Sequence, residues 1–242
     1  PPEQRERLKA LLEQRGGGYP LQYLLGEWEF YSLPFKVGPG VLIPRQDTET
    51  LVDAALGVLG SMDVPQPQVL DLCSGSGCVA IAIKHEYPAA VVTAQEFSFE
   101  AYSYLTQNIA LNGLEIIPHR SDLREYTHPV PVDVILSNPP YIPKSQFRDL
   151  QMEVGFEPLA ALDGGEDGLY YFRAIARRFK EQLRPGGALL LEIGMGQEEE
   201  VSTILRENNF EQITFHKDLS GTVRVVESRS PTSGAAKGTT LS

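Results

Sequence analysis

One short segment of the chain, residues 137–141, has the sequence Ser-Asn-Pro-Pro-Tyr and carries groups suited to chemistry. It follows an apolar run at residues 132–136 that is typical of a buried strand. Two prolines must end that strand, because proline lacks the N–H of a sheet ladder and fixes its own φ angle. We therefore expect the Asn138 amide at a strand's carboxyl end, where open α/β sheets bind ligands.

The stiff turn at Pro139 and Pro140 suits the binding of a planar amide or amino group. Its carbonyl oxygens have no helix or sheet partner, the amide of Asn138 precedes them, and the aromatic ring of Tyr141 follows. We expect these four residues to hold such a group. An ordinary Asn-Pro turn is the alternative interpretation.

A second candidate site is a strand, a glycine-rich turn and a helix in succession. The turn follows a predicted strand at residues 68–72 and consists of Cys73, Ser74, Gly75, Ser76 and Gly77. Such a turn lets the backbone approach a nucleotide-like ligand. Glu96 ends the next predicted strand about 20 residues further on, where a carboxylate can accept both hydroxyls of a ribose. A solvated loop acid is the alternative for Glu96.

The glycine turn does not have the pattern of a phosphate loop or the full spacing of a dinucleotide fingerprint. Asp71, just before the turn, would repel a pyrophosphate and attract a cation. A positively charged nucleoside without phosphate fits best, and S-adenosylmethionine is such a ligand. Asp122, at the end of a third predicted strand, can accept the adenine amino group while Leu123 covers the ring. A helix cap is the alternative for Asp122.

Strands and helices are predicted to alternate along most of the chain. The expected strands are at residues 68–72, 91–94, 115–119, 132–136 and 188–193, with a closing pair at 211–216 and 222–226. The expected helices between them are at residues 78–85, 100–112, 168–183 and 197–208. This alternation is typical of an α/β fold with a mainly parallel sheet and right-handed crossovers. The long connection at residues 141–167 is expected to form a flap over the site.

The chain is expected to divide into four regions. They are a helix interpreted as the remnant of a helical domain (residues 1–18), a β-hairpin linker (19–40), the α/β domain (41–228) and a disordered tail (229–242). A plain N-terminal extension is the alternative for the first region. At the start of the α/β domain, Asp47 or Thr48 is expected to cap a helix. Arg45 is expected to act through an acid of the site or a backbone carbonyl; a surface arginine is the alternative.

The composition narrows the possible functions. A net charge of −11 argues against a broad nucleic-acid footprint. No apolar stretch approaches the roughly 20 residues of a membrane helix, and no signal peptide opens the sequence. Cys73 and Cys78 are expected to be small buried residues, and the four histidines have no metal-ligand spacing. We therefore expect a cytoplasmic protein without metal.

Four motifs together connect the chain to a known family: residues 42–49, 71–77, 138–141, and 156–158 with the glycines of 164–168. With them, the chain resembles the protein-glutamine methyltransferases that modify peptide-chain release factors, over roughly residues 18–227. The resemblance implies a seven-stranded, mainly parallel class I S-adenosylmethionine-dependent methyltransferase sheet, Rossmann-like, with an N-terminal helical domain and a β-hairpin. It implies donor contacts from Cys73 to Gly77, Glu96, Asp122, Leu123 and Asn138. The implied acceptor is the glutamine of a release factor's Gly-Gly-Gln loop.

The chain departs from the family's usual pattern at several positions. Gln46 replaces a proline, Cys73-Ser74 replaces Gly-Thr, and Glu96 replaces an aspartate. These changes are mild, because serine keeps a hydroxyl and glutamate keeps a carboxylate. Most of the family's N-terminal helical domain is missing from this sequence, so we expect weaker binding of the protein substrate.

The resemblance leads to a hypothesis for the chemistry. The Asn138 side-chain oxygen and the Pro139 carbonyl are expected to accept the two hydrogens of the substrate amide, with Tyr141 packed on the amide plane. Three alternatives remain: methylation of adenine's exocyclic amine in nucleic acid, methylation of a ribosomal-protein glutamine, and a non-catalytic binding module. The net charge disfavours nucleic acid, and the intact segment at residues 138–141 disfavours a module without activity.

Overall fold

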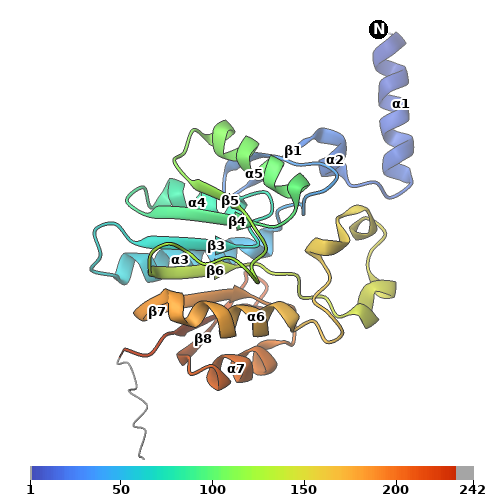
Figure 1. Cartoon of the computed structure of the whole chain (residues 1–242). Coiled ribbons are helices and arrows are strands. Elements are labelled where there is room, and N and C mark those ends of the chain that lie inside the picture. The colour runs from blue at the N-terminus through green and yellow to red at the C-terminus, as the bar shows by residue number, and fades with distance from the viewer. Residues whose placement is uncertain (1, 233–242) are drawn as a thin grey trace, which may run out of the picture.

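A seven-stranded mixed sheet forms the centre of this computed structural model, which describes residues 2–232 (Figure 1). The strands are β3 (Gln68–Leu72), β4 (Val91–Glu96), β5 (Ile117–Arg120), β6 (Val132–Ser137), β7 (Leu183–Glu192), β8 (Glu211–Lys217) and β9 (Val223–Arg229). Their order in the sheet is β5-β4-β3-β6-β7-β9-β8. The first five are parallel, and β9 pairs antiparallel with both β7 and β8. The predicted α/β fold with a mainly parallel sheet is confirmed.

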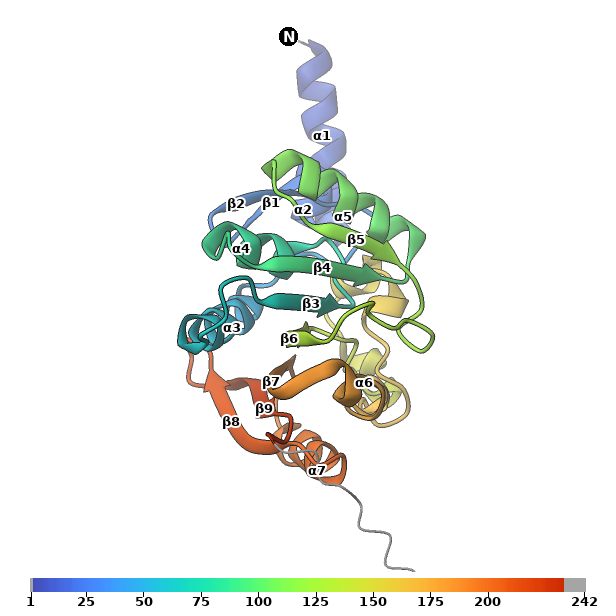
Figure 2. The same ribbon diagram turned by 60° about the vertical axis from the view of Figure 1, so that its left-hand side comes forward.

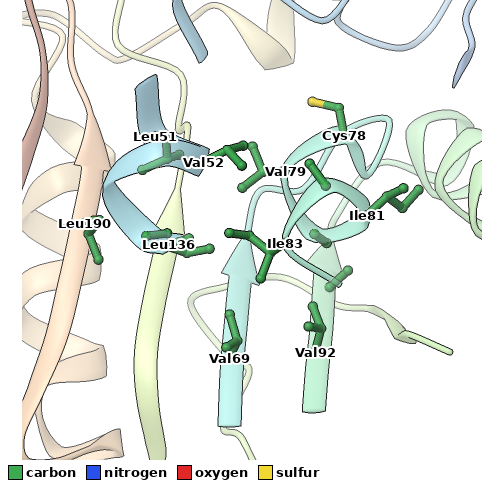
Figure 3. Packing of buried hydrophobic residues seen from close by; sticks show 14 of the residues in the cluster. Leu51, Val52, Val69, Cys78, Val79, Ile81, Ile83, Val92, Leu136 and Leu190 are labelled. Carbon is green, nitrogen blue, oxygen red and sulfur yellow. The ribbon is translucent and has the colours of Figure 1, made fainter. Parts of the chain in front are cut away.

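Five helices cover the two faces of the sheet: α3 (Glu49–Ser61), α4 (Cys78–Glu86), α5 (Phe99–Asn112), α6 (Tyr170–Phe179) and α7 (Glu198–Glu207). Figure 2 shows α3 and α4 on one side and α6 on the other. Because side chains alternate along a strand, neighbouring residues enter different cores. Leu190 of β7 packs with α3 and α4, whereas Leu189 and Leu191 pack with α6 and α7. Figure 3 shows the first of these cores around β3 and β4.

The N-terminal region consists of α1 (Pro2–Gly16), α2 (Leu21–Leu25) and a hairpin of β1 (Glu27–Phe30) and β2 (Leu33–Lys36). Helix α1 extends away from the sheet (Figures 1 and 2). The side chains of Leu8 and Leu12 on this helix are exposed. The hairpin is anchored by the fully buried side chain of Asn108 on α5. Its amide oxygen accepts from the Lys36 N–H at 2.7 Å, and its amide nitrogen donates to the Lys36 carbonyl at 3.1 Å.

Two predicted boundaries in the C-terminal half are wrong. Helix α6 ends at Phe179 and a 3₁₀ turn (Lys180–Gln182) follows, so the Pro185-Gly186 segment lies inside β7 instead of ending the helix. Strand β9 includes Arg229, and Ser230 is buried with its hydroxyl 2.6 Å from the Arg184 carbonyl. The predicted start of the tail at residue 229 is therefore wrong. Most of the predicted tail, residues 233–242, lies outside the described residues.

The connection between β6 and α6 contains three 3₁₀ turns: Lys144–Asp149, Val154–Phe156 and Leu159–Ala161. It lies beside the N-terminal region (Figure 1). The Phe156 ring packs edge-on against Tyr19 with centroids 5.2 Å apart, and Glu153 pairs with Arg15 at 2.6 Å. This connection, called the flap below, therefore joins the N-terminal region to the rim of the sheet.

Candidate active site

A cavity of about 260 Å³ opens at the carboxyl edge of β3, β4 and β6. Its walls come from the glycine turn, the end of β4, the turn after β6, the segment before α3 and the flap. The predicted site residues that line it are Cys73, Ser74, Gly75, Ser76, Glu96, Asp122, Leu123, Asn138 and Pro140. The lining excludes Gly77, Pro139 and Tyr141.

Strand register explains why these distant residues meet. β3 lies between β4 and β6, and Leu72 pairs with Gln95 on one side and with Ser137 on the other. The next residue on each strand is therefore Cys73, Glu96 or Asn138, all at one edge. The Ser137 hydroxyl donates to the Leu72 carbonyl at 2.8 Å, which fixes the two strand ends to each other.

The glycine turn has a backbone that favours glycine at two positions. Gly75 and Gly77 have φ angles of 55° and 82°, and Cys73, the first residue of the turn, has φ 58°. A Cβ added at Gly77 would collide with the side chain of Leu105 on α5. A Cβ at Gly75 would meet no atom within 4 Å. Gly77 therefore allows close helix packing, while the backbone at Gly75 borders the cavity.

Glu96 ties the glycine turn to the end of β4. Its carboxylate accepts hydrogen bonds from the Gly75 N–H at 2.8 Å and from the Ser98 N–H at 2.7 Å. The residue is only 8% exposed; burial raises the pKa of its carboxyl, and these two backbone donors oppose the rise. Carboxylate oxygens have more lone pairs than these two bonds use, so Glu96 can still accept ligand hydroxyls.

Asp71 supplies a buried carboxylate with an unsatisfied oxygen. The side chain lines the cavity and is 1% exposed, and its Oδ2 has no hydrogen-bond partner among the described residues. Burial raises the pKa of this carboxyl to about 7, while the hydroxyl of Ser74 opposes the rise. A buried carboxylate is stabilised by an opposite charge. The cavity therefore fits a ligand that carries a positive charge.

Asp122 is held by its own loop. Arg124 binds both carboxylate oxygens through Nε at 2.9 Å, and its N–H donates to Oδ1 at 2.8 Å. The Arg124 guanidinium lowers the pKa of Asp122. Asp122, the predicted acceptor for an adenine amino group, is thus charged and already pairs with Arg124. This pairing was not predicted from the sequence. Leu123 beside it is 4% exposed and belongs to the core under α6.

The Asn138 side chain has a defined orientation. Its Nδ2 donates to the hydroxyl of Thr48 at 3.2 Å. Neither Asp47 nor Thr48 caps α3 with its side chain, contrary to the prediction: a 3₁₀ turn (Gln46–Thr48) leads into the helix, and Asp47 pairs with Arg224 at 2.8 Å. Because Thr48 takes one of the two Asn138 N–H donors, the Asn138 oxygen and one N–H remain for other partners.

Tyr141 lies behind the turn and not in the cavity. A Cβ added at Gly194 would be 3.2 Å from Cδ2 of its ring, and its carbonyl accepts from the Gln197 amide at 3.1 Å. Burial raises the pKa of its hydroxyl, and the negative charge of Glu192 adds to the rise. Tyr141 is partly buried, and Pro139 is buried. The packing of Tyr141 on a substrate amide stays a prediction. The position of its side chain outside the cavity lining does not favour it.

An ion pair joins two of the sequence motifs. Arg45 binds Glu157, and the other oxygen of Glu157 accepts from the Ile43 N–H at 2.9 Å. The Glu157 side chain is 2% exposed. Arg45 thus pairs with an acid, but Glu157 does not line the cavity, so a role for Arg45 through an acid of the site stays a prediction. The pair fastens the flap to the segment that leads into α3.

The flap also needs a glycine at one contact with the Asn-Pro-Pro-Tyr turn. A Cβ at Gly164 would lie 2.8 Å from the backbone C and Cα atoms of Tyr141, which cannot move independently of the turn. We expect Gly164→Ala to lower the free energy of unfolding by about 1–3 kcal/mol in urea denaturation. Gly155→Ala on the same flap is the control, because its Cβ meets nothing within 4 Å. Equal losses from the two variants would contradict this packing argument.

The sheet order, the glycine turn and the cavity at the strand ends together define a class I methyltransferase fold. The family model of the methyltransferase small domain matches residues 49–154. A T. thermophilus 16S rRNA methyltransferase, solved in complex with AdoMet and guanosine, superimposes with a TM-score of 0.60. It is 21% identical and covers 84% of this chain and 49% of its own, a likeness that shows the fold alone.

Two curated relatives, both release factor glutamine methyltransferases, show the particular family. The protein from Fusobacterium nucleatum is 39% identical over 228 residues, which are 93% of this chain and 64% of the relative. The protein from Thermodesulfovibrio yellowstonii is 39% identical over 226 residues, which are 93% of this chain and 81% of the relative. The chain thus spans just under two thirds of the first relative's length. It belongs to the release factor glutamine methyltransferase family, which confirms the predicted resemblance.

Residues 2–232 contain neither a membrane-spanning helix nor a cluster of metal ligands. No helix in this part of the chain is long and apolar enough to cross a membrane. Within the same residues, no group of three or more histidine, cysteine, aspartate and glutamate side chains could hold a metal ion.

Proposed function

We propose that the chain transfers a methyl group from S-adenosylmethionine to the side-chain amide nitrogen of a glutamine, that of the Gly-Gly-Gln motif in a peptide-chain release factor. The observation that carries the proposal is the shared cavity. Asp71 and Glu96, which suit a cationic nucleoside, line the same space as Asn138, whose oxygen suits an amide. Membership of the release factor glutamine methyltransferase family supports the choice of acceptor.

The residues of the cavity match the parts of the donor. S-adenosylmethionine, when bound, would supply a methyl group from a positively charged sulfur. The sulfur would keep the electron pair of the broken bond, and the amide nitrogen would release one hydrogen to water as a proton. Glu96 would accept the ribose hydroxyls, the unpartnered oxygen of Asp71 would stabilise the positive charge, and Leu123 would cover the adenine. Asp122, which also accepts from Arg124, would accept a hydrogen bond from the adenine amino group. The backbone of the glycine turn would lie against the nucleoside at Gly75.

Asn138 would provide the chemistry on the acceptor side. An amide nitrogen is a poor nucleophile because its lone pair is delocalised into the carbonyl. The Asn138 oxygen would accept one of the amide hydrogens and thereby turn the nitrogen lone pair toward the methyl group. A second bond to the Pro139 carbonyl stays a prediction, because Pro139 is buried and does not line the cavity. Alignment of two reactants in a dry pocket can contribute up to about 7–11 kcal/mol. Apolar side chains in the cavity wall, among them Leu42, Pro140 and Pro158, would exclude water.

The test is transfer of a labelled methyl group to a purified peptide-chain release factor. We expect label in the factor with an intact Gly-Gly-Gln motif and none when the glutamine is replaced by alanine. A ribosomal-protein fraction and a short nucleic-acid duplex complete the comparison, because both correspond to predicted alternatives. The net charge of −11 favours a protein acceptor over nucleic acid. Label in the factor whose motif glutamine is replaced by alanine, or label only in one of the other acceptors, would refute the proposal.

A further inference from the structure

The end of β7 carries a buried carboxylate that the mechanism above does not use. Glu192 is 2% exposed, and its Oε2 has no hydrogen-bond partner among the described residues. Leu191 pairs with Ser137 in the parallel register of β7 and β6. The next residue on each strand is therefore Glu192 or Asn138, so the buried acid stands beside the residue that would hold the substrate.

Thr48 connects these two side chains. It is 2% exposed, and its hydroxyl oxygen accepts from the Asn138 Nδ2 at 3.2 Å. Burial raises the pKa of the Glu192 carboxyl to about 7, and a hydrogen bond from Thr48 is the largest effect that opposes the rise. Asp47, Arg224 and Tyr141 are the other groups that influence this carboxyl. Thr48 thus accepts from Asn138 and is close enough to Glu192 to influence that carboxyl.

The hydrogen-bonding capacity of the Thr48 hydroxyl determines which end of the Asn138 amide faces it. A threonine hydroxyl has one donor and two lone pairs. When Glu192 takes the donor, only lone pairs face Asn138, so the asparagine must present its NH₂ group to Thr48. Its oxygen then points the other way. If the Asn138 amide were flipped, its NH₂ group would face the NH₂ group of the substrate amide. Both groups are donors, so the substrate amide would have no acceptor.

We propose that Thr48 and Glu192 are positioning residues that hold the Asn138 side chain with its oxygen toward the substrate amide. This inference rests on the proposed function for the identity of the acceptor, a primary amide. It assigns no contact with the substrate to either residue. It also accounts for a buried acid beside the site and for a threonine that begins a helix without capping it.

The first test compares turnover on release factor for variants of Thr48. Thr48→Val removes the hydroxyl with little change of shape, and we expect kcat to fall about 10- to 100-fold with the donor KM almost unchanged. Thr48→Ser should recover most of the loss. Thr50→Val is the matched control, because Thr50 lies two positions after Thr48 in the sequence and does not line the cavity. A Thr48→Val rate within about 3-fold of the Thr50→Val rate would overturn the inference.

Glu192 is tested with a pair of replacements of similar size. Glu192→Leu removes the acceptor, whereas Glu192→Gln keeps an oxygen that can accept from Thr48. We expect kcat to fall about 10-fold or more in the leucine variant and to recover in the glutamine variant, with melting curves showing that both fold. Equal rates for the two variants would contradict the role given to Glu192.

A measurement without substrate separates this inference from the proposed function. The side-chain NH₂ signals of Asn138 can be followed by NMR in the free protein. We expect them to shift and to exchange faster with water in Thr48→Val, and to remain unchanged in Thr50→Val. Signals unchanged in Thr48→Val would overturn the inference. Absence of any methyl transfer by the unmodified protein, with the signals shifted as expected, would refute the proposed function alone.

Discussion

Replacing Asn138 by alanine is expected to lower the rate of methyl transfer by about 100-fold or more while the chain still folds. The variant loses the oxygen that would orient the substrate amide, so the nitrogen lone pair is no longer held toward the methyl group. Only a partly buried polar side chain is removed, and β6 keeps its pairing with β3 and β7. Single-turnover transfer of labelled methyl to release factor measures the effect.

The matched control for this variant is Asn112→Ala. Asn112 ends α5, bonds to the Pro34 carbonyl at 3.0 Å and lies outside the cavity lining. It should leave the transfer rate within about 3-fold of the unmodified chain. The affinity of Asn138→Ala for the methyl donor is measured as well, because it shows whether the donor site is still intact in this variant. Near-normal turnover of Asn138→Ala would remove this residue from the proposed role.

Replacing Glu96 by alanine is expected to weaken donor binding about 10- to 100-fold. Two losses act together, because the carboxylate would accept the ribose hydroxyls and also holds the Gly75 N–H at 2.8 Å. Titration calorimetry with S-adenosylhomocysteine measures the affinity without any methyl acceptor. Glu115→Ala, at an exposed position on the loop before β5, is the control. An affinity that does not change in Glu96→Ala would reject the ribose assignment.

Local sequence patterns were sufficient to predict the sheet. Residues 68–72 were predicted as a strand and form β3 without any difference in bounds, because an apolar run is followed directly by a glycine turn. The location of the site at the carboxyl edge of the sheet was predicted in the same way, because the carboxyl ends of parallel strands lie at one edge. The start of β7 was misplaced because Arg184-Pro185-Gly186-Gly187 has the composition of a helix end, yet Gly187 sits among strand neighbours in the sheet.

Side-chain partners far apart in the sequence could not be predicted. Arg45 and Glu157 are separated by 112 residues, and Thr48 and Asn138 by 90. No local pattern records such a pair, because it depends on how the flap and the segment before α3 pack against the sheet. Tyr141 illustrates the same limit: its position in the motif suited a place in the cavity, but the packing against Gly194 turns its ring behind the turn.

The central claim is that one cavity holds both a cationic nucleoside and a glutamine amide. The most direct measurement is a crystal structure with S-adenosylhomocysteine and a Gly-Gly-Gln peptide bound. We predict the ribose hydroxyls at Glu96, and the peptide's glutamine nitrogen within hydrogen-bond distance of the Asn138 oxygen and facing the sulfur. A nucleoside bound in the groove between α3 and β8, or a glutamine held away from Asn138, would contradict the claim.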